Sequence, residues 1–161
     1  MTVAIGEIIP NIELPATGGR DIGLADFRGH TLVLFFYPKA STPGCTQEGR
    51  DFRDAIEAFR AAGAEVLGAS RDGIKAQENF KRKQKFPFEL LSDKEELLCK
   101  AFDVIKLKKN YGREYLGIER STFLINSQGV LCREWRKVKV KGHVAEVLEA
   151  VETLHSGAAS A

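Results

Sequence analysis

The 161-residue sequence lacks both the disulfide framework that stabilises small secreted proteins and the long apolar segments that anchor proteins in membranes. It holds three cysteines, Cys45, Cys99 and Cys132, and this odd number at wide spacing argues against a disulfide framework and for a reducing compartment. No apolar run approaches the roughly 20 residues that span a bilayer, and the N-terminal segment lacks a basic stretch followed by a long apolar one. We therefore expect a cytoplasmic protein that does not bind membranes.

Strong charge of either sign is also missing. Lys and Arg total 24 against 22 for Asp and Glu, and the net charge of +2 gives no field that would attract nucleic acid. His30, His143 and His155 share no metal-ligand spacing with the cysteines, and no Cys-x-x-Cys pair occurs. We therefore predict no metal, no other cofactor and no dithiol reductase activity.

The hydrophobic content of 43% is sufficient for one domain over residues 1–155 without metal or disulfide staples. No internal repeat or linker interrupts it. The last residues, 156–161, read SGAASA and are predicted to form a disordered tail.

The hydrophobic pattern predicts strands and helices in alternation. Turn residues punctuate residues 1–29, which indicates an extended arm or hairpin, and residues 106–117 form a basic, glycine-punctuated loop. Continuous apolar runs and amphipathic spacing predict strands at 32–37, 65–70, 88–91, 122–125 and 130–136, and helices at 52–63, 74–85, 93–102 and 144–154. This order is expected of a thioredoxin-like α/β sandwich with a mixed central sheet and an N-terminal hairpin extension.

The segment around Cys45 carries the most chemical information. Thr42 suits the N-cap of a helix and Pro43 its first position, which places Cys45 in the first turn. There the free backbone amides and the positive end of the helix dipole favour a thiolate, and such settings lower the pKa of a thiol from about 8.5 to roughly 3.5–7.5. A buried cysteine that acts as a small hydrophobe is the alternative. The narrow Pro43-Gly44 setting favours a nucleophilic thiol.

The sequence FYPKASTPGCTQE resembles the active-site stretch of the peroxiredoxins, with their Pro-x-x-x-Thr-x-x-Cys pattern at Pro38, Thr42 and Cys45. Its Thr-Pro-Gly-Cys-Thr form is similar to the bacterioferritin comigratory protein, or peroxiredoxin Q, branch. Further likeness lies in GEIIPNIELPATGG, FPFELLSD and GIERSTFLIN, so that the resemblance covers nearly the whole chain.

The resemblance implies a thiol peroxidase for antioxidant defence, which reduces hydrogen peroxide and organic hydroperoxides. Cys45 would attack a peroxide oxygen and become a sulfenic acid. Thr42 would hydrogen-bond the thiolate and the peroxide, Pro38 would shield the pocket from water, and Arg120 would stabilise the thiolate and polarise the leaving oxygen. From the residues alone, Thr42 is also a plain helix cap, Pro38 a strand terminator, and Arg120 one half of a surface ion pair with Glu119 or a neighbouring strand.

The resolving cysteine of many branch members is absent. Arg50 stands five residues after Cys45, and residues 80–85 (FKRKQK) occupy the helix where other members carry it. Cys99 fits a packed core thiol better than a resolving partner, although both interpretations stay open, and Cys132 is predicted to be a bystander. We therefore predict a monomer with a one-cysteine-type cycle, in which thioredoxin or glutathione with glutaredoxin reduces oxidised Cys45.

Two other functions remain compatible with the sequence. One is a redox sensor or holdase whose Cys45 oxidises with little turnover, and the other is a non-catalytic thioredoxin-like binding module. Two basic stretches, 106–113 and 133–141, are predicted to be solvated surface, with binding of a redox partner or glutathione as the alternative.

Overall fold

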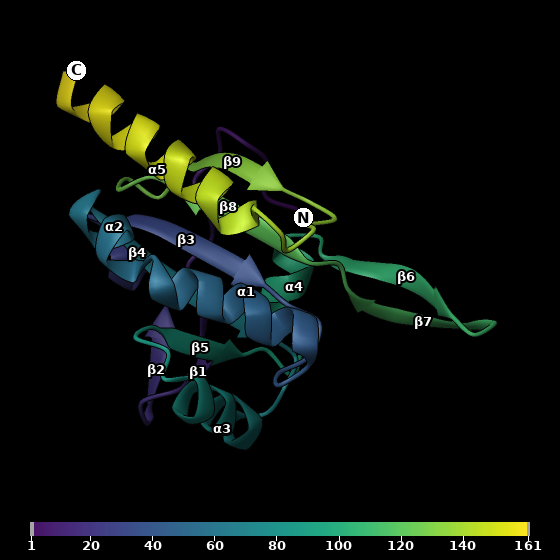
Figure 1. Cartoon of the computed structure of the whole chain (residues 1–161). Helices are drawn as coiled ribbons and strands as arrows, with labels where there is room; N and C mark the ends of the chain where they lie inside the picture. Colours follow the sequence, from purple (N-terminus) through teal and green to yellow (C-terminus); the bar gives the residue numbers. More distant parts are fainter. Residues whose placement is uncertain (1, 161) are drawn as a thin grey trace.

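The structure is a computed structural model of the chain and describes residues 2–160, with the side chains of residues 158–160 left aside. Its central feature is a seven-stranded mixed sheet with the order β2-β1-β5-β4-β3-β8-β9 (Figure 1). Its strands are β1 (Glu13–Ala16), β2 (Arg20–Gly23), β3 (Thr31–Phe36), β4 (Ala64–Ser70), β5 (Glu89–Ser92), β8 (Ser121–Ile125) and β9 (Leu131–Trp135). The α/β class and the N-terminal hairpin, formed by antiparallel β1 and β2, agree with the sequence prediction.

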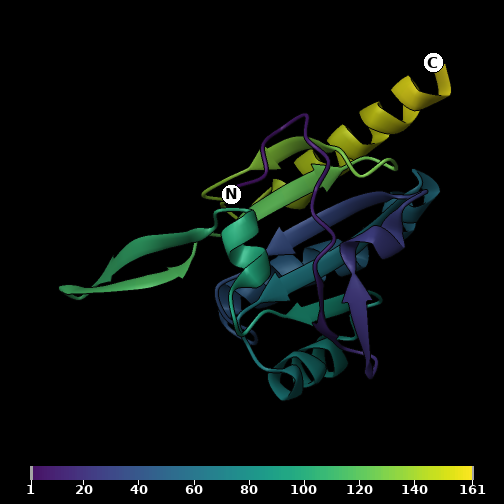
Figure 2. The ribbon, with the colours of Figure 1, turned by 180° about the vertical axis from the view of Figure 1, so that it is seen from behind.

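Five α-helices and a short 3-10 helix complete the body. They are α1 (Pro43–Asp54), α2 (Ile56–Ala61), α3 (Ile74–Gln84), α4 (Leu97–Ala101), α5 (His143–Ser160) and η1 (Leu24–Phe27). Helices α1, α2 and α5 cover one face of the sheet, and α4 lies on the other (Figures 1 and 2). The alternation of strand β3 separates the two cores that result, because Val33, Phe35 and Tyr37 enter the first whereas Leu32, Leu34 and Phe36 enter the second.

Strand β3 also explains where the chemistry of this fold lies. It runs parallel to β4 and antiparallel to β8, and Phe36 at its carboxyl end pairs with Ser121 at the start of β8. The loop that leaves β3, the start of α1 and the residue before β8 therefore meet at one edge of the sheet.

Two predicted helices differ from the structure in length. The helix predicted up to Gly63 is broken at Ala55 into α1 and α2. The helix predicted over 93–102 is shorter, since Asp93 precedes α4 and its carboxylate accepts hydrogen bonds from the backbone N–H groups of Leu98 and Cys99. An aspartate ahead of a helix satisfies the free amides there, and its own residue stays outside the helix.

The prediction that residues 106–117 form a basic loop was wrong. The chain forms two antiparallel strands, β6 (Ile105–Asn110) and β7 (Arg113–Ile118), which project from the body (Figures 1 and 2). Tyr111 and Gly112 join them, and both have positive φ, at 52° and 77°. A two-residue turn with two positive φ angles matches the twist of a hairpin, and this is why the segment pairs with itself.

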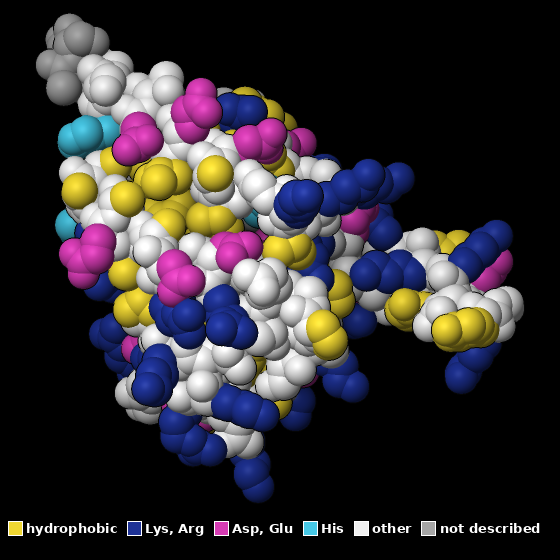
Figure 3. Space-filling model, in the orientation of Figure 1, with side chains coloured by type: hydrophobic (Ala, Val, Ile, Leu, Met, Phe, Trp, Pro, Cys, Tyr) yellow, Lys and Arg dark blue, Asp and Glu magenta, His cyan; other side chains and the backbone are white. Residues whose placement is uncertain are grey.

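The carboxyl-terminal helix also runs further than predicted. Helix α5 continues through Ser160, so it includes residues predicted to be disordered, and Ala161 lies outside the described residues. On the face shown in Figure 3, acidic side chains lie mostly on the upper part of the body, and basic side chains dominate its lower part. Within residues 2–160, no helix has the length and apolar character needed to cross a bilayer.

Candidate functional site

Cys45 is the third residue of α1 and lies at the sheet edge where β3 ends. Its side chain is 1% exposed. The guanidinium of Arg120 donates a hydrogen bond from Nη2 to Cys45 Sγ at 3.5 Å. The sulfur therefore lies both at the positive end of a helix and beside a permanent cation.

Arg120 makes a second contact that anchors it. Its Nη1 donates to Oε1 of Glu48 at 2.7 Å, and Glu48 lies three residues after Cys45 on the same side of α1. Glu48 is fully buried, while the side chain of Arg120 is 15% exposed. The planar guanidinium thus spans a carboxylate and a sulfur, as a fork-shaped donor is suited to do. The alternative that the sequence allowed for Arg120, a surface ion pair with Glu119, does not describe this geometry.

Burial sets the protonation of Glu48. Removal from water raises its pKa from 4.5 to about 7, although the adjacent charge of Arg120 and its hydrogen bond act in the opposite direction. Its second oxygen, Oε2, has no hydrogen-bond partner in the described part of the chain. The carboxyl group therefore titrates near neutral pH, next to the cation that contacts the sulfur.

This titration predicts a pH dependence of stability. The unfolded chain releases the Glu48 proton near pH 4.5, whereas the folded chain keeps it up to about 7, so the contribution of Glu48 to the free energy of unfolding should fall as pH rises through this window. The lowered pKa of His143 acts in the opposite direction between pH 4 and 6.5, and it does so equally in wild type and in a Glu48 variant. The Glu48 contribution lost over the whole window is on the order of 3.5 kcal/mol, since the two pKa values, 4.5 and about 7, are 2.5 apart and one pKa unit corresponds to about 1.4 kcal/mol. In Glu48→Gln the loss should be absent, as measured by urea unfolding at pH 5 and pH 8. The exposed Glu57→Gln is the control, and an unchanged pH slope in Glu48→Gln would contradict the prediction.

The loop between β3 and α1 carries Pro38 and Thr42. Thr42 occupies the N-cap position and Pro43 the first helical position, as the sequence predicted. The hydroxyl of Thr42, however, does not cap the helix and donates to the carbonyl oxygen of Lys39 at 2.7 Å. Pro38 follows Tyr37 at the start of this loop and is half-buried.

A buried network of polar side chains holds the loop between β3 and α1 in place. The phenol of Tyr37 donates to Oε1 of Gln77 at 2.6 Å, and Gln77 Nε2 donates to the hydroxyl of Ser70 at 3.0 Å. Ser70 in turn donates to Oδ2 of Asp72 at 2.6 Å, and the same oxygen accepts the backbone N–H of Ala40 at 2.8 Å. Burial raises the pKa of Tyr37 well above its ordinary value, so the phenol stays protonated and able to donate. The network fixes the path of the loop that leads to the reactive helix turn.

The comparisons with known proteins agree with this geometry. The sequence pattern of the AhpC/TSA family matches residues 5–133. Peroxiredoxin Bcp of Bacillus subtilis (strain 168) is 51% identical over 154 residues, which cover 96% of this chain and 98% of the relative. The chain belongs to the peroxiredoxins of the AhpC/TSA family.

Solved structures extend the likeness to three dimensions. Peroxiredoxin Q of Xanthomonas campestris superimposes with a TM-score of 0.86 at 51% identity, covering 89% of this chain and 91% of that chain. A structure of the Xanthomonas campestris bacterioferritin comigratory protein, described for its alkyl peroxide reduction activity, gives a TM-score of 0.86 at 47% identity, with 92% and 99% covered. The predicted thioredoxin-like peroxiredoxin fold is confirmed, and membership makes the chain a thiol peroxidase.

Of the residues predicted from the sequence, this peroxiredoxin brings Cys45 and Arg120 into contact and places Thr42 and Pro38 in the adjoining loop. Cys99 lies elsewhere, in the core on the opposite face of the sheet from Cys45. Burial raises the pKa of the Cys99 thiol far above its ordinary value, and a hydrogen bond with Asp93 adds to the shift. The folded structure therefore offers Cys99 neither reactivity nor access to Cys45.

Cys132 is also remote from the reactive helix turn. It is half-buried on β9, where burial raises its pKa, and it donates from Sγ to the carbonyl oxygen of Val130 at 3.5 Å. It follows Leu131, which pairs with Ile125 at the end of β8 opposite to Ser121, whereas Ser121 pairs with Phe36 at the sheet edge that carries Cys45. All three cysteines of this peroxiredoxin are free thiols.

Glu48 is the site residue that sequence reasoning missed. Its signal was available, because a carboxylate three residues after Cys45 must share a helix face with it. That face is otherwise buried against the sheet through Gly49 and Phe52. An acidic residue on the buried side of a helix needs a cationic partner, and this requirement points to Arg120.

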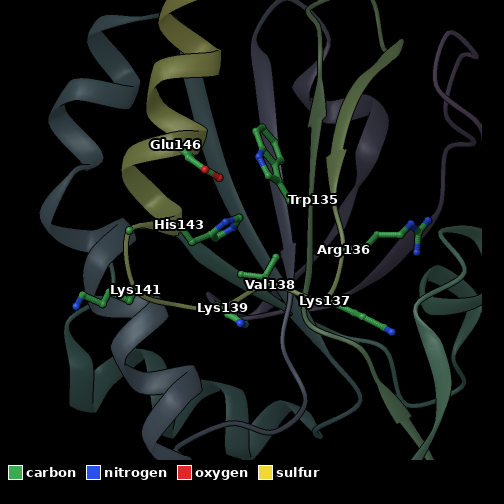
Figure 4. A pocket seen from close by; sticks show the side chains of 9 residues that line it. Trp135, Arg136, Lys137, Val138, Lys139, Lys141, His143 and Glu146 are labelled. Atoms are coloured by element: carbon green, nitrogen blue, oxygen red, sulfur yellow. The ribbon is translucent and has the colours of Figure 1, made fainter.

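A basic pocket of about 510 Å³ borders the site on the side of α5 (Figure 4). Val138 in its wall donates its N–H to the carbonyl oxygen of Arg120 at 3.0 Å. His143 and Glu146 point toward Trp135 across it. His143 is held by the hydroxyl of Thr122 at 2.8 Å, and burial, with the nearby charge of Arg120, lowers its pKa to about 4. The imidazole is therefore neutral at physiological pH, and the positive charge of the pocket comes from Arg136 and its three lysines, Lys137, Lys139 and Lys141.

Proposed function

We propose that this peroxiredoxin reduces hydrogen peroxide and organic hydroperoxides through Cys45. The observation that carries the proposal is the guanidinium of Arg120, which contacts Cys45 Sγ while Glu48 holds its other nitrogen. A cation fixed against the sulfur stabilises the negative charge that develops on oxygen during the reaction.

The chemical step is a transfer of oxygen to sulfur. The Cys45 thiolate attacks one peroxide oxygen, the O–O bond breaks, and the other oxygen leaves as an alkoxide or hydroxide that takes up a proton. The sulfur is oxidised to a sulfenic acid and the peroxide is reduced to an alcohol or water. Arg120 stabilises the leaving oxygen. The hydroxyl group of Thr42 forms a hydrogen bond with the incoming peroxide, and Pro38 shields the sulfur from water.

An organic substrate is supported by the relative from Xanthomonas campestris, which is described for alkyl peroxide reduction. The walls of the site agree with it. Cys45 belongs to the same buried hydrophobic cluster as Phe52 and Tyr37, which supports an apolar setting for the sulfur.

Regeneration of Cys45 requires an external thiol. Cys99 lies in the opposite core, and a disulfide needs Cα atoms within about 7 Å. The sulfenic acid would condense with the external thiol, releasing water and forming a mixed disulfide. A second thiol then reduces this disulfide, which returns Cys45 and leaves the two external sulfurs joined. Thioredoxin, or glutathione with glutaredoxin, would supply these thiols.

The trapped intermediate tests this cycle. After one equivalent of peroxide, mass spectrometry should find Cys45 as a sulfenic acid, and as a glutathione adduct when glutathione is present. Cys99→Ser and Cys132→Ser should give the same products in the same yield. A disulfide between Cys45 and Cys99 as the main product would overturn the one-cysteine cycle.

A redox sensor is the second candidate, favoured by the low exposure of Cys45, 1%, together with the remoteness of the other thiols. Turnover separates the two functions. Sustained NADPH oxidation in a thioredoxin- or glutaredoxin-coupled assay with peroxide supports the enzyme, while stoichiometric oxidation of Cys45 at background turnover supports the sensor.

A further inference from the structure

The β6–β7 hairpin contributes no residue to the catalytic site described above. It stands away from the body as a two-stranded sheet of its own (Figures 1 and 2). Its base is fixed by the N–H of Glu119, which donates to the carbonyl oxygen of Val104 at 2.7 Å, and by Arg71, which donates to the carbonyl oxygen of Leu116 at 3.2 Å. Two-stranded hairpins are marginally stable in water without further packing, so a surface that covers this one would stabilise it.

The hairpin gathers exposed apolar side chains. Among the described residues, eight large hydrophobic side chains are exposed, and Leu107, Tyr111, Tyr115 and Leu116 of the hairpin are four of them. Leu107 and Leu116 are cross-strand partners, 59% and 61% exposed, and form one continuous outward patch. Single exposed hydrophobic residues are ordinary, but a contiguous group on one projecting element is typical of an interaction site.

The same hairpin is basic. It contains four cationic side chains and one anionic one, which gives it a net charge of +3 against +2 for the whole chain. Figure 3 shows basic and hydrophobic side chains side by side on the projecting part. A second copy of this hairpin would carry the same charge, so contact between two hairpins is disfavoured. The surface complements an acidic protein that has an apolar contact of its own.

The base of the hairpin continues into the catalytic site. Strand β7 ends at Ile118, two residues before Arg120. Lys108 and Tyr115 form a cross-strand pair whose side chains lie beside Gly117 near the end of β7, since a methyl group at Gly117 would lie 3.3 Å from each of them. A protein that rests on the hairpin is therefore next to the residue that contacts Cys45.

We propose that the β6–β7 hairpin is the docking surface for an acidic protein thiol reductant that regenerates oxidised Cys45. The inference rests on the proposed function, and it makes the reductant a protein of the thioredoxin type instead of free glutathione. Cys45 is 1% exposed, so its reduction requires a local opening of the first turn of α1. A reductant held on the hairpin is present at high effective concentration whenever that opening occurs.

Steady-state assays with thioredoxin, thioredoxin reductase, NADPH and peroxide test the surface. The variant Leu107→Thr with Leu116→Thr removes the apolar patch and keeps strand-forming residues. It should lower kcat/KM for thioredoxin by about tenfold or more, as the loss of central interface contacts does. Lys109→Glu should lower it as well, and the effect should shrink at high ionic strength.

Two control variants make the same kinds of substitution at exposed residues outside the hairpin. Ile8→Thr alters a residue that is 67% exposed and bridges to Val130, at the far end of the sheet, and Lys83→Glu reverses an exposed charge on α3. Both should behave as wild type. Turnover with dithiothreitol and the rate of Cys45 oxidation by peroxide should be the same in all variants.

Several outcomes would overturn the docking surface while the peroxidase function stands. These are unchanged thioredoxin kinetics in the hairpin variants, an equal loss with thioredoxin and dithiothreitol, or a turnover of wild type with glutathione alone that equals its turnover with thioredoxin. Sedimentation that shows a wild-type dimer lost in the Leu107→Thr and Leu116→Thr variant would assign the surface to a second copy instead. Absence of Cys45 oxidation in every protein would instead contradict the proposed function itself.

Discussion

Replacement of Cys45 by serine should reduce peroxide turnover to the uncatalysed background, a loss on the order of 10³-fold or more. A serine hydroxyl is a poor nucleophile at neutral pH and has no counterpart of the sulfenic acid. Neither the helix dipole nor Arg120, at 3.5 Å from the sulfur, can compensate for the missing chemistry. Coupled NADPH oxidation with thioredoxin, and separately with glutathione and glutaredoxin, measures the loss.

The other two cysteines provide the matched controls. Cys99→Ser and Cys132→Ser remove thiols that lie in the opposite core and on β9, so each should retain the turnover of wild type. Cys99 is fully buried, and its replacement by a polar hydroxyl is expected to lower the thermal midpoint without a change in kcat at lower temperature. Parental activity in Cys45→Ser would contradict the assignment of Cys45 as the nucleophile.

The features that the sequence predicts well depend on neighbours along the chain. A continuous apolar run from Leu32 onward is typical of a strand buried on both faces, and β3 is such a strand. The start of α1 is likewise local, because Pro43 and Thr42 specify a helix start by their own backbone preferences. The position of Cys45 in the first helical turn follows from those residues alone.

What the sequence does not reveal depends on contacts between distant segments. Arg120 and Glu48 are 72 positions apart, and their ion pair exists because β8 lies against β3. The hydroxyl of Thr42 could cap the helix or bond back to the loop, and the fold of the loop selects Lys39. The hairpin was missed for another reason. Its lysines interrupt the alternation of apolar and polar residues that predicts a strand, and its turn is marked only by Tyr111 and Gly112.

Substitution of Arg120 should give the second-largest kinetic effect. Arg120→Met keeps the length of the side chain but removes the donor to Cys45 Sγ and the charge that meets the developing oxyanion. The rate of Cys45 oxidation by peroxide should fall by about 10²- to 10³-fold, as when one preorganised donor is removed from an oxyanion site. A stopped-flow measurement with hydrogen peroxide under single-turnover conditions reports this step apart from thiol recycling.

Loss of Arg120 also leaves Glu48 buried without its cation, and a merely structural role would appear as lost stability. Glu48 would then bind a proton more tightly, because the Arg120 charge that lowers its pKa is gone. The double variant Arg120→Met with Glu48→Gln removes this buried charge and should recover stability in urea unfolding without recovering the oxidation rate. Recovery of both by the double variant would mean that Arg120 serves the fold and not the chemistry, whereas partial rate recovery in Arg120→Lys would show that charge at this position assists the reaction.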